Sequence, residues 1–128
     1  MDRNLCFILN GISVYNDFCL IRDDIPIFFT CKDECEKYYV ALCVDMDLPR
    51  YNVVKVTIIE LNNMLQGIIS MRKIFTLQHE YWEVTPIDEK IENDKVIIKS
   101  MTDMKLEDLP DEGAYFELFS EELTENII

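Results

Sequence analysis

The 128-residue chain carries 25 Asp and Glu against 12 Lys and Arg, a formal net charge of −13 with a sequence pI of about 4.3. Hydrophobic residues make up 49% of it, which excludes a disordered chain and predicts one domain over residues 1–128. Three glycines and no basic cluster exclude Gly-rich phosphate-binding loops and direct binding to nucleic acid.

The chain is expected to be cytoplasmic and without membrane contact. No apolar run approaches the roughly 18 residues of a membrane span, and the start, Met1–Asn4, lacks the basic region of a signal peptide. Five cysteines, an odd number without an export signal, predict reduced thiols. Of these, Cys6, Cys19 and Cys43 lie in apolar runs and are expected to act as small core residues.

The first half of the chain reads mainly as strands. The short apolar run Leu5–Leu9 is followed by Ile12–Ile21, which is interpreted as a strand or as a turn followed by a strand. Aromatic and β-branched residues over Pro26–Cys31 and Tyr38–Asp45 predict the two strands of a hairpin. Tyr51–Val56 predicts one more short strand.

Two short helices are expected in mid-chain. Thr57, followed three residues later by Glu60, forms a capping-box pattern at the start of a run with helical spacing, and Gly67 is expected to end that helix. Ser70 has the character of a second N-cap and predicts a helix over Met71–Leu77.

The second half returns to strands. Tyr81–Thr85 and Lys95–Met101 predict a second hairpin, and Leu106–Gly113 predicts an irregular acidic loop. The last residues, 114–128, are ambiguous, although four apolar residues fall on one helical face: Phe116, Phe119, Leu123 and Ile127. Strands before and after one helical pair predict an α+β fold with a mostly antiparallel sheet of about five or six strands, followed by an acidic C-terminal segment, 102–128.

Four stretches of the chain carry a resemblance. Residues 27–32 read Ile-Phe-Phe-Thr-Cys-Lys, and residues 38–45 read Tyr-Tyr-Val-Ala-Leu-Cys-Val-Asp. The stretch Leu61–Phe75 and the acidic Leu-Pro motif of Leu106–Gly113 follow. Together they are similar, over residues 14–116, to an uncharacterised family of small acidic bacterial and phage domains.

The resemblance implies a cellular and genomic context but no biochemical activity. The chain departs from the family pattern at Cys43, where tryptophan is expected, and at Cys31, where alanine is usual. No function comes with the family. What the resemblance implies is a bacterial host cell and a place among defence, counter-defence or toxin-associated genes.

Catalytic and metal-binding patterns are incomplete. His79, the only histidine, would need a nearby thiol for Cys-His catalysis, and a solvated or capping side chain is the more usual role. Cys31 and Cys35 lack the two further ligands of a zinc site. Several carboxylate pairs lack the rest of a calcium-loop pattern: Asp23 with Asp24, Asp45 with Asp47, and Asp111 with Glu112. We therefore expect no enzyme, no cofactor and no metal.

Tyr81 and Trp82 are candidates for a partner contact or for the core. In a strand, Trp82 shares a face with Val84, which favours a buried Trp82. Tyr81 on the opposite face is then the candidate contact residue.

The acidic C-terminal region is the main candidate binding surface. It holds −8 of the net −13, with Lys105 as its one base. The candidate partner-binding acids are Asp103, Glu107, Asp108, Asp111, Glu112, Glu117, Glu121, Glu122 and Glu125. These acids are interpreted either as a solvated face that keeps the protein soluble or as a surface for a basic partner.

The function expected from these features is inhibition by binding. The chain is expected to be a non-enzymatic acidic protein that inhibits a basic nucleic-acid-binding protein such as a nuclease, a CRISPR effector or a toxin. A phage anti-CRISPR-type inhibitor and a toxin immunity protein both fit this mechanism. The alternative is a small structural subunit of a bacterial defence complex, and an enzyme comes third. The structural-subunit alternative predicts self-association, for example as a homodimer.

Overall fold

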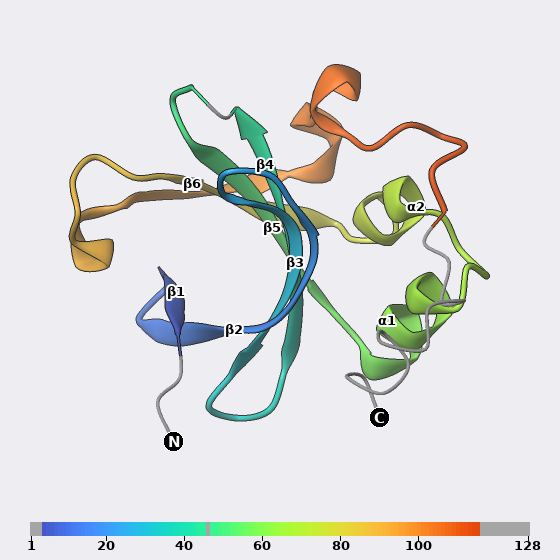
Figure 1. Ribbon diagram of the computed structural model, residues 1–128, viewed down its shortest axis with the longest axis horizontal. Coiled ribbons are helices and arrows are strands. Elements are labelled where there is room, and N and C mark those ends of the chain that lie inside the picture. The colour runs from blue at the N-terminus through green and yellow to red at the C-terminus, as the bar shows by residue number, and fades with distance from the viewer. Residues whose placement is uncertain (1–3, 46, 116–128) are drawn as a thin grey trace.

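The computed structural model describes residues 4–45 and 47–115 as one sheet with two short helices beside it (Figure 1). Within these residues, seven strands pair in chain order, each antiparallel to the next. The strands are β1 (Leu5–Leu9), β2 (Ile12–Arg22), β3 (Pro26–Asp33), β4 (Tyr38–Asp45), β5 (Arg50–Val56), β6 (Glu80–Thr85) and β7 (Lys95–Ser100). The helices are α1 (Ile58–Leu65) and α2 (Met71–Thr76), and the 3₁₀ turns are η1 (Ile91–Asn93), η2 (Met101–Asp103) and η3 (Leu106–Asp108).

The predicted α+β class with five or six strands is wrong. The described chain is instead a mostly antiparallel β fold. Residues 5–22 form one more hairpin, β1–β2, and β2 pairs with β3 to extend the same sheet. The helices, of eight and six residues, are a single excursion between β5 and β6, which remain neighbours in the sheet. Strands before and after the helices therefore belong to one meander.

Several local predictions are confirmed. β3 and β4 form the first predicted hairpin, and β6 and β7 form the second. The Thr57 hydroxyl accepts from the backbone N–H of Glu60, whose carboxylate accepts from the N–H of Thr57, so the capping box is present. Ser70 caps α2 by accepting from the N–H of Lys73. Gly67 follows α1 with a φ of 75°, a left-handed conformation that glycine adopts without strain.

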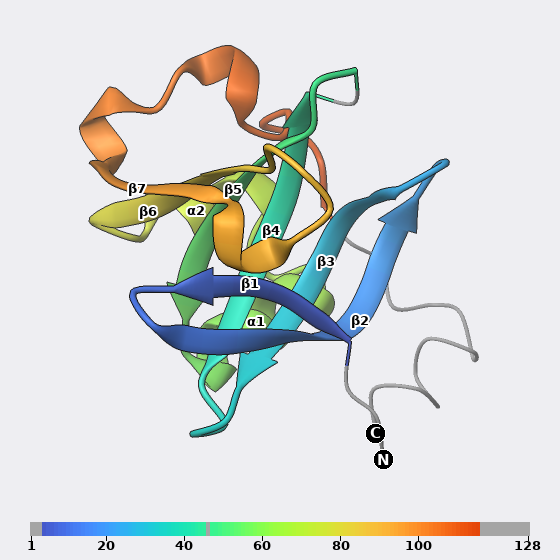
Figure 2. The ribbon, with the colours of Figure 1, turned by 90° about the vertical axis from the view of Figure 1, so that its left-hand side faces the viewer.

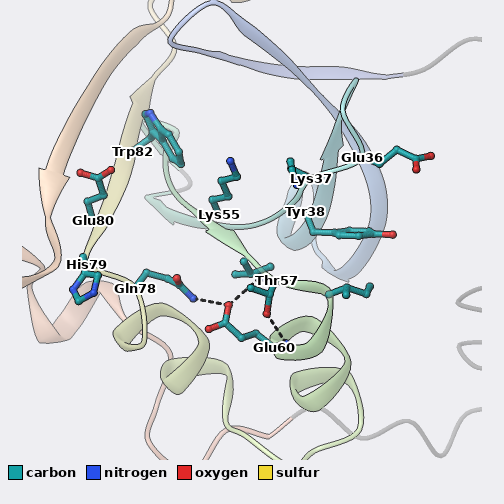
Figure 3. Close-up of a pocket in the computed structure, with 12 residues that line it drawn as sticks. Glu36, Lys37, Tyr38, Lys55, Thr57, Glu60, Gln78, His79, Glu80 and Trp82 are labelled. Carbon is teal, nitrogen blue, oxygen red and sulfur yellow. Dashed lines mark hydrogen bonds between the residues drawn. The ribbon is translucent and has the colours of Figure 1, made fainter.

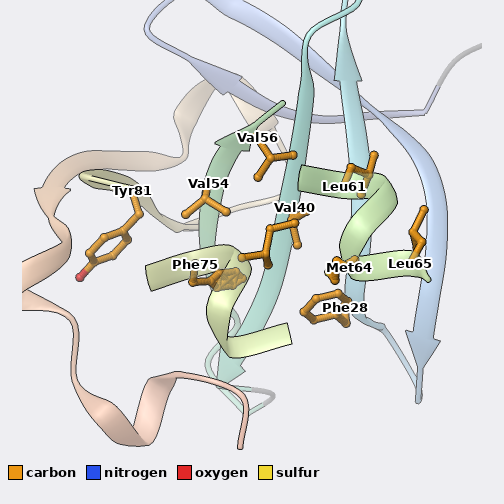
Figure 4. Packing of buried hydrophobic residues seen from close by; sticks show 10 residues of the cluster. Phe28, Val40, Val54, Val56, Leu61, Met64, Leu65, Phe75 and Tyr81 are labelled. Carbon is orange, nitrogen blue, oxygen red and sulfur yellow. The ribbon is translucent and has the colours of Figure 1, made fainter. Parts of the chain in front are cut away.

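The sheet has a hydrophobic cluster on each face. Successive residues alternate between them, so Val54 faces the helices while Val53 faces the opposite side. The helix-side cluster, shown in Figure 4, consists of Phe28, Val40, Val54, Val56, Leu61, Met64, Leu65, Ile74, Phe75 and Tyr81. The opposite cluster consists of Phe7, Leu9, Val14, Phe29, Cys31, Tyr39, Ala41, Val53 and Val84.

The second cluster exists because the sheet curls into a half-barrel. Three irregularities in the pairing of β2 with β3 bend β2, and Figure 2 shows β1 crossing over the sheet face opposite the helices. Phe7 of β1 thereby stacks on Phe29 of β3 with ring centroids 6.0 Å apart, and it contacts Tyr51 of β5 edge-on at 5.5 Å.

Asp33 fixes the turn between β3 and β4. Its Oδ1 accepts from the backbone N–H of Cys35 at 2.8 Å and of Lys37 at 3.0 Å, and its Oδ2 accepts from the Tyr39 hydroxyl at 2.7 Å. Only 3% of Asp33 is exposed. Burial alone would raise the pKa of this carboxyl, but these hydrogen bonds outweigh it and the pKa lies below its usual value.

Candidate functional site

Residues 101–115, the start of the predicted acidic segment, are docked on the helix side of the fold. Met101 and Met104 pack against the helix-side cluster, as does Leu109. The Met101 N–H donates to the His79 carbonyl at 2.8 Å, and the Met71 N–H at the start of α2 donates to the Ala114 carbonyl at 2.9 Å. This stretch is therefore an integral layer of the structure.

Arg50 connects the segment to the sheet by ion pairs. Its guanidinium lies 3.3 Å from Glu83 Oε2 and 3.5 Å from Asp108 Oδ2, and Lys99 Nζ lies 2.9 Å from the same Glu83 oxygen. Burial would raise the pKa of Glu83, but the hydrogen bond from Lys99 and the charges of Lys99 and Arg50 lower it. The hydrogen bond to Glu83 in turn raises the pKa of Lys99. Both shifts favour the charged forms of Glu83 and Lys99.

Replacing Arg50 by methionine is expected to lower the free energy of unfolding by about 1–2 kcal/mol, because two partly buried carboxylates lose their shared partner. Urea unfolding measures this cost, and limited proteolysis should show faster cleavage within residues 101–109. Arg22→Met is the matched control, since Arg22 is exposed and forms no ion pair with the described residues. An Arg50 variant as stable and as resistant as this control would contradict the anchoring role.

The predicted partner-binding acids divide into three groups. Asp103, Glu107 and Asp111 are exposed and form no ion pair with the rest of the described chain. Asp108 is held by Arg50, and the 87% exposed Glu112 side chain lies 3.7 Å from Arg72. The remaining predicted acids lie outside the described residues: Glu117, Glu121, Glu122 and Glu125.

Tyr81, predicted to be the exposed contact residue, is buried, and Trp82, predicted to be buried, packs against the opposite cluster but is only partly buried. Tyr81 is 3% exposed in the helix-side cluster, whereas Trp82 is only partly buried. Trp82 and Val84 do share a face, as alternation requires. The face of Tyr81 is closed by the docked segment, with Met101 and Met104 in the same cluster, so Tyr81 is not an exposed contact residue.

The surface of the described residues carries uncompensated negative charge. The structure describes 20 of the 25 carboxylates, and among them only Glu83, Asp108 and Glu112 have a basic side chain within 4 Å in the described chain. Among the residues that the structure describes, seven Lys and Arg are exposed, against fourteen acids. The exposed acids are Asp17, Asp23, Asp24, Glu34, Glu36, Asp47, Glu80, Asp88, Glu89, Glu92, Asp103, Glu107, Asp111 and Glu112.

Sequence reasoning missed a second acidic region formed by three turns. In an antiparallel meander, the turns β2–β3, β4–β5 and β6–β7 lie at the same end of the strands. They carry eight acids between them: Asp23, Asp24, Asp45, Asp47, Asp88, Glu89, Glu92 and Asp94. Asp94 is partly buried, and this burial, with the charges of Asp88 and Glu92, raises its pKa. The signal in the sequence was the acidic composition of these three turns, but only the strand order places them at the same end of the sheet.

The five cysteines are free thiols. Cys31 and Cys43 are buried, Cys6 and Cys19 are partly buried, and Cys35 is exposed. Cys31 therefore joins the core while Cys35 faces solvent, and they do not point into a common site. In the described part of the chain, no three His, Cys, Asp or Glu side chains are arranged to hold a metal ion.

A pocket of about 700 Å³ lies where β5 and β6 separate, and Figure 3 shows its lining. Charged and aromatic side chains surround it, among them Lys37, Lys55, Glu60, His79, Glu80 and Trp82. His79, the histidine of the enzyme alternative, lines this pocket, and no cysteine is among the residues that line it.

Comparisons with known proteins supply no family for this chain. No family model matches it, no curated protein matches it, and no solved structure matches it. In the part that the structure describes, no helix is long and apolar enough to cross a membrane.

Proposed function

We propose that this chain is a non-enzymatic acidic binding protein that inhibits a basic nucleic-acid-handling protein of a bacterial host cell. The observation that carries the proposal is the uncompensated surface charge, with fourteen exposed acids against seven exposed bases in the described residues. A cleft that normally binds phosphates presents Lys and Arg side chains, and carboxylates can pair with these in place of the nucleic acid.

The docked segment, residues 101–115, carries both charged and exposed apolar side chains for such an interface. Asp103, Glu107 and Asp111 supply charge, while Leu106 is 73% exposed and Tyr115 is 50% exposed within the same stretch. Charged groups at the rim raise the association rate, and desolvated apolar anchors contribute most of the affinity. Because Tyr81 is buried, Tyr115 and Leu106 replace it as the proposed anchors. The resemblance to acidic bacterial and phage domains supports a counter-defence or immunity setting.

Neutralising Asp103, Glu107 and Asp111 together is expected to abolish capture of the basic partner. The triple variant Asp103→Asn, Glu107→Gln, Asp111→Asn keeps side-chain shape and removes only charge. Immobilised protein is exposed to host lysate at low salt and at about 0.5 M salt, where the Debye length falls to a few Å. The wild type should capture a nucleic-acid-binding protein at low salt, release it at high salt, and lose it to added duplex DNA.

The matched control removes the same charge elsewhere. Asp23→Asn, Asp24→Asn and Glu89→Gln neutralise two Asp and one Glu in the turns at the strand ends, and this variant should capture the partner like the wild type. If both triple variants lost capture of the partner equally, the result would indicate nonspecific charge attraction. A partner that resists both high salt and duplex DNA would contradict inhibition by charge.

One observation favours the structural-subunit alternative. β7 pairs only with β6 among the described strands, so its second edge is open, and its adjacent residues Ile97 and Ile98 are 36% and 45% exposed. Exposed isoleucines on an open edge are suited to strand pairing with another chain. Such a contact would survive 0.5 M salt, which separates it from the electrostatic mechanism.

A further inference from the structure

The pocket between β5 and β6 arises from a break in strand pairing. The two strands pair only through Tyr51–Val53 on β5 and Val84–Trp82 on β6, and beyond these residues they separate. Figure 3 shows the separated strands above the start of α1, with pocket residues from both sides. The volume of about 700 Å³ falls within the usual range for small-molecule sites, roughly 300–1,000 Å³.

Trp82 gives the pocket an aromatic wall. It lines the pocket while its ring also lies against buried Tyr39, with centroids 5.9 Å apart. This second contact helps to hold the indole in place, so a planar ligand ring could stack on it without reordering the side chain. Trp82 is also the only tryptophan of the chain.

Two lysines supply positive charge beside this wall. Lys37 and Lys55 both line the pocket, are exposed, and form no ion pair among the described residues. Figure 3 places Lys55 between Trp82 and Lys37. Most of the described Lys and Arg form no ion pair, so these two lysines are distinguished by lining the same pocket. An anionic group on a ligand could pair with them there.

The three acids that line the pocket differ in their hydrogen bonds and in their orientation. Glu60 is engaged, since its Oε1 accepts from the Thr57 N–H at 2.9 Å and from Gln78 Nε2 at 3.2 Å. Glu36 points away from the other lining side chains in Figure 3. Glu80 is exposed, lies on the Trp82 side and has no ion pair in the described chain, so it remains as a hydrogen-bond acceptor.

We propose that this pocket binds a mononucleotide, with the base stacked on Trp82, a ring amino group donating to Glu80, and the phosphate held by Lys37 and Lys55. A nucleotide has the same order of features as the pocket: an aromatic ring with a donor at one end and an anion at the other. The inference does not depend on the acidic-partner function, because none of the acids proposed for that contact lines this pocket.

The test uses AMP as the probe and Trp82 fluorescence as the signal. Excitation at the red edge of indole absorption reports only this residue, since no other tryptophan is present. AMP should quench the emission with saturation, and calorimetry should give the same dissociation constant. Adenosine and inorganic phosphate alone should each bind at least about tenfold more weakly, and UMP, which lacks the ring amino group, should also bind more weakly.

Matched variants locate the contacts. Lys55→Gln should weaken AMP binding about tenfold or more and leave adenosine unchanged, whereas Glu80→Gln should reduce the preference for AMP over UMP. Lys73→Gln is the control, because Lys73 is exposed on α2 and does not line the pocket. Circular dichroism confirms that each variant is folded.

The outcomes separate clearly. Saturable AMP binding that Lys55→Gln weakens and Lys73→Gln does not would support the site. Three results would overturn the site: no saturable quenching by AMP, equal affinity for AMP and adenosine, or equal loss of AMP affinity in Lys55→Gln and Lys73→Gln. Tighter binding of a four-residue oligodeoxyadenylate than of AMP would overturn a free nucleotide as the ligand, since its extra phosphates should be repelled by the acidic surface.

Discussion

Replacing Asp33 by alanine is expected to lower the free energy of unfolding by about 3 kcal/mol. The buried carboxylate satisfies three donors at once, the backbone N–H groups of Cys35 and Lys37 and the Tyr39 hydroxyl. A buried donor left without a partner costs about 1–3 kcal/mol, and the exposed turn allows water to replace part of the loss. Chemical unfolding in urea at pH 7 measures the difference.

Two further variants separate the roles of the carboxylate. Tyr39→Phe removes only the hydroxyl and should cost about 1 kcal/mol, because the ring still packs in its cluster. Asp33→Asn retains one acceptor oxygen and should fall between wild type and alanine. An alanine variant no less stable than Tyr39→Phe would show that the turn does not depend on Asp33.

The pH dependence follows from the lowered pKa of Asp33. Because the folded state binds this proton less readily than the unfolded chain, the carboxylate contributes stability above its unfolded pKa, about 3.9. That contribution is lost as the pH falls through the lower, folded-state value. The stability gap between wild type and Asp33→Asn should therefore stay constant from pH 7 to about 5 and shrink below about pH 4.

Local elements were predictable where one signal dominated. The Thr57–Glu60 capping box and the Ser70 N-cap located both helices, and aromatic and β-branched runs located the β3–β4 hairpin. The β2 strand was harder to assign because its bulges break the alternation of apolar and polar residues. Without β1 and β2 the sheet could not be counted, and the fold class was misjudged.

The candidate sites depended on contacts between distant segments. Alternation correctly put Trp82 and Val84 on one face, but it could not show that residues 101–115 cover the other face and bury Tyr81. The pairing of Asp108 with Arg50 joins residues 58 positions apart. The pocket arises from the separation of β5 and β6, which has no sequence motif. The net charge follows from composition, but only the fold shows which acids are paired with a basic side chain.

Replacing Phe75 by alanine is expected to lower the free energy of unfolding by about 3–5 kcal/mol, a large share of the 5–15 kcal/mol of a typical domain. Phe75 is fully buried, and its ring centroid lies 6.3 Å from that of Phe28 across the interface between α2 and the sheet. The variant removes a whole ring from a cluster supplied by both helices and the sheet, and the short helices cannot collapse far enough to refill it.

The matched control for Phe75 is Ile59→Ala on α1. Ile59 is 69% exposed, so its removal should change stability by no more than about 0.5 kcal/mol. Loosening α2 should also release the segment after Asp108, because Arg72 Nε donates to the Pro110 carbonyl at 2.6 Å and the Met71 N–H donates to Ala114. Faster proteolysis of that segment in Phe75→Ala than in Ile59→Ala is therefore expected. Equal stability of the two variants would contradict the packing of α2 on the sheet, and with it the support of the acidic segment.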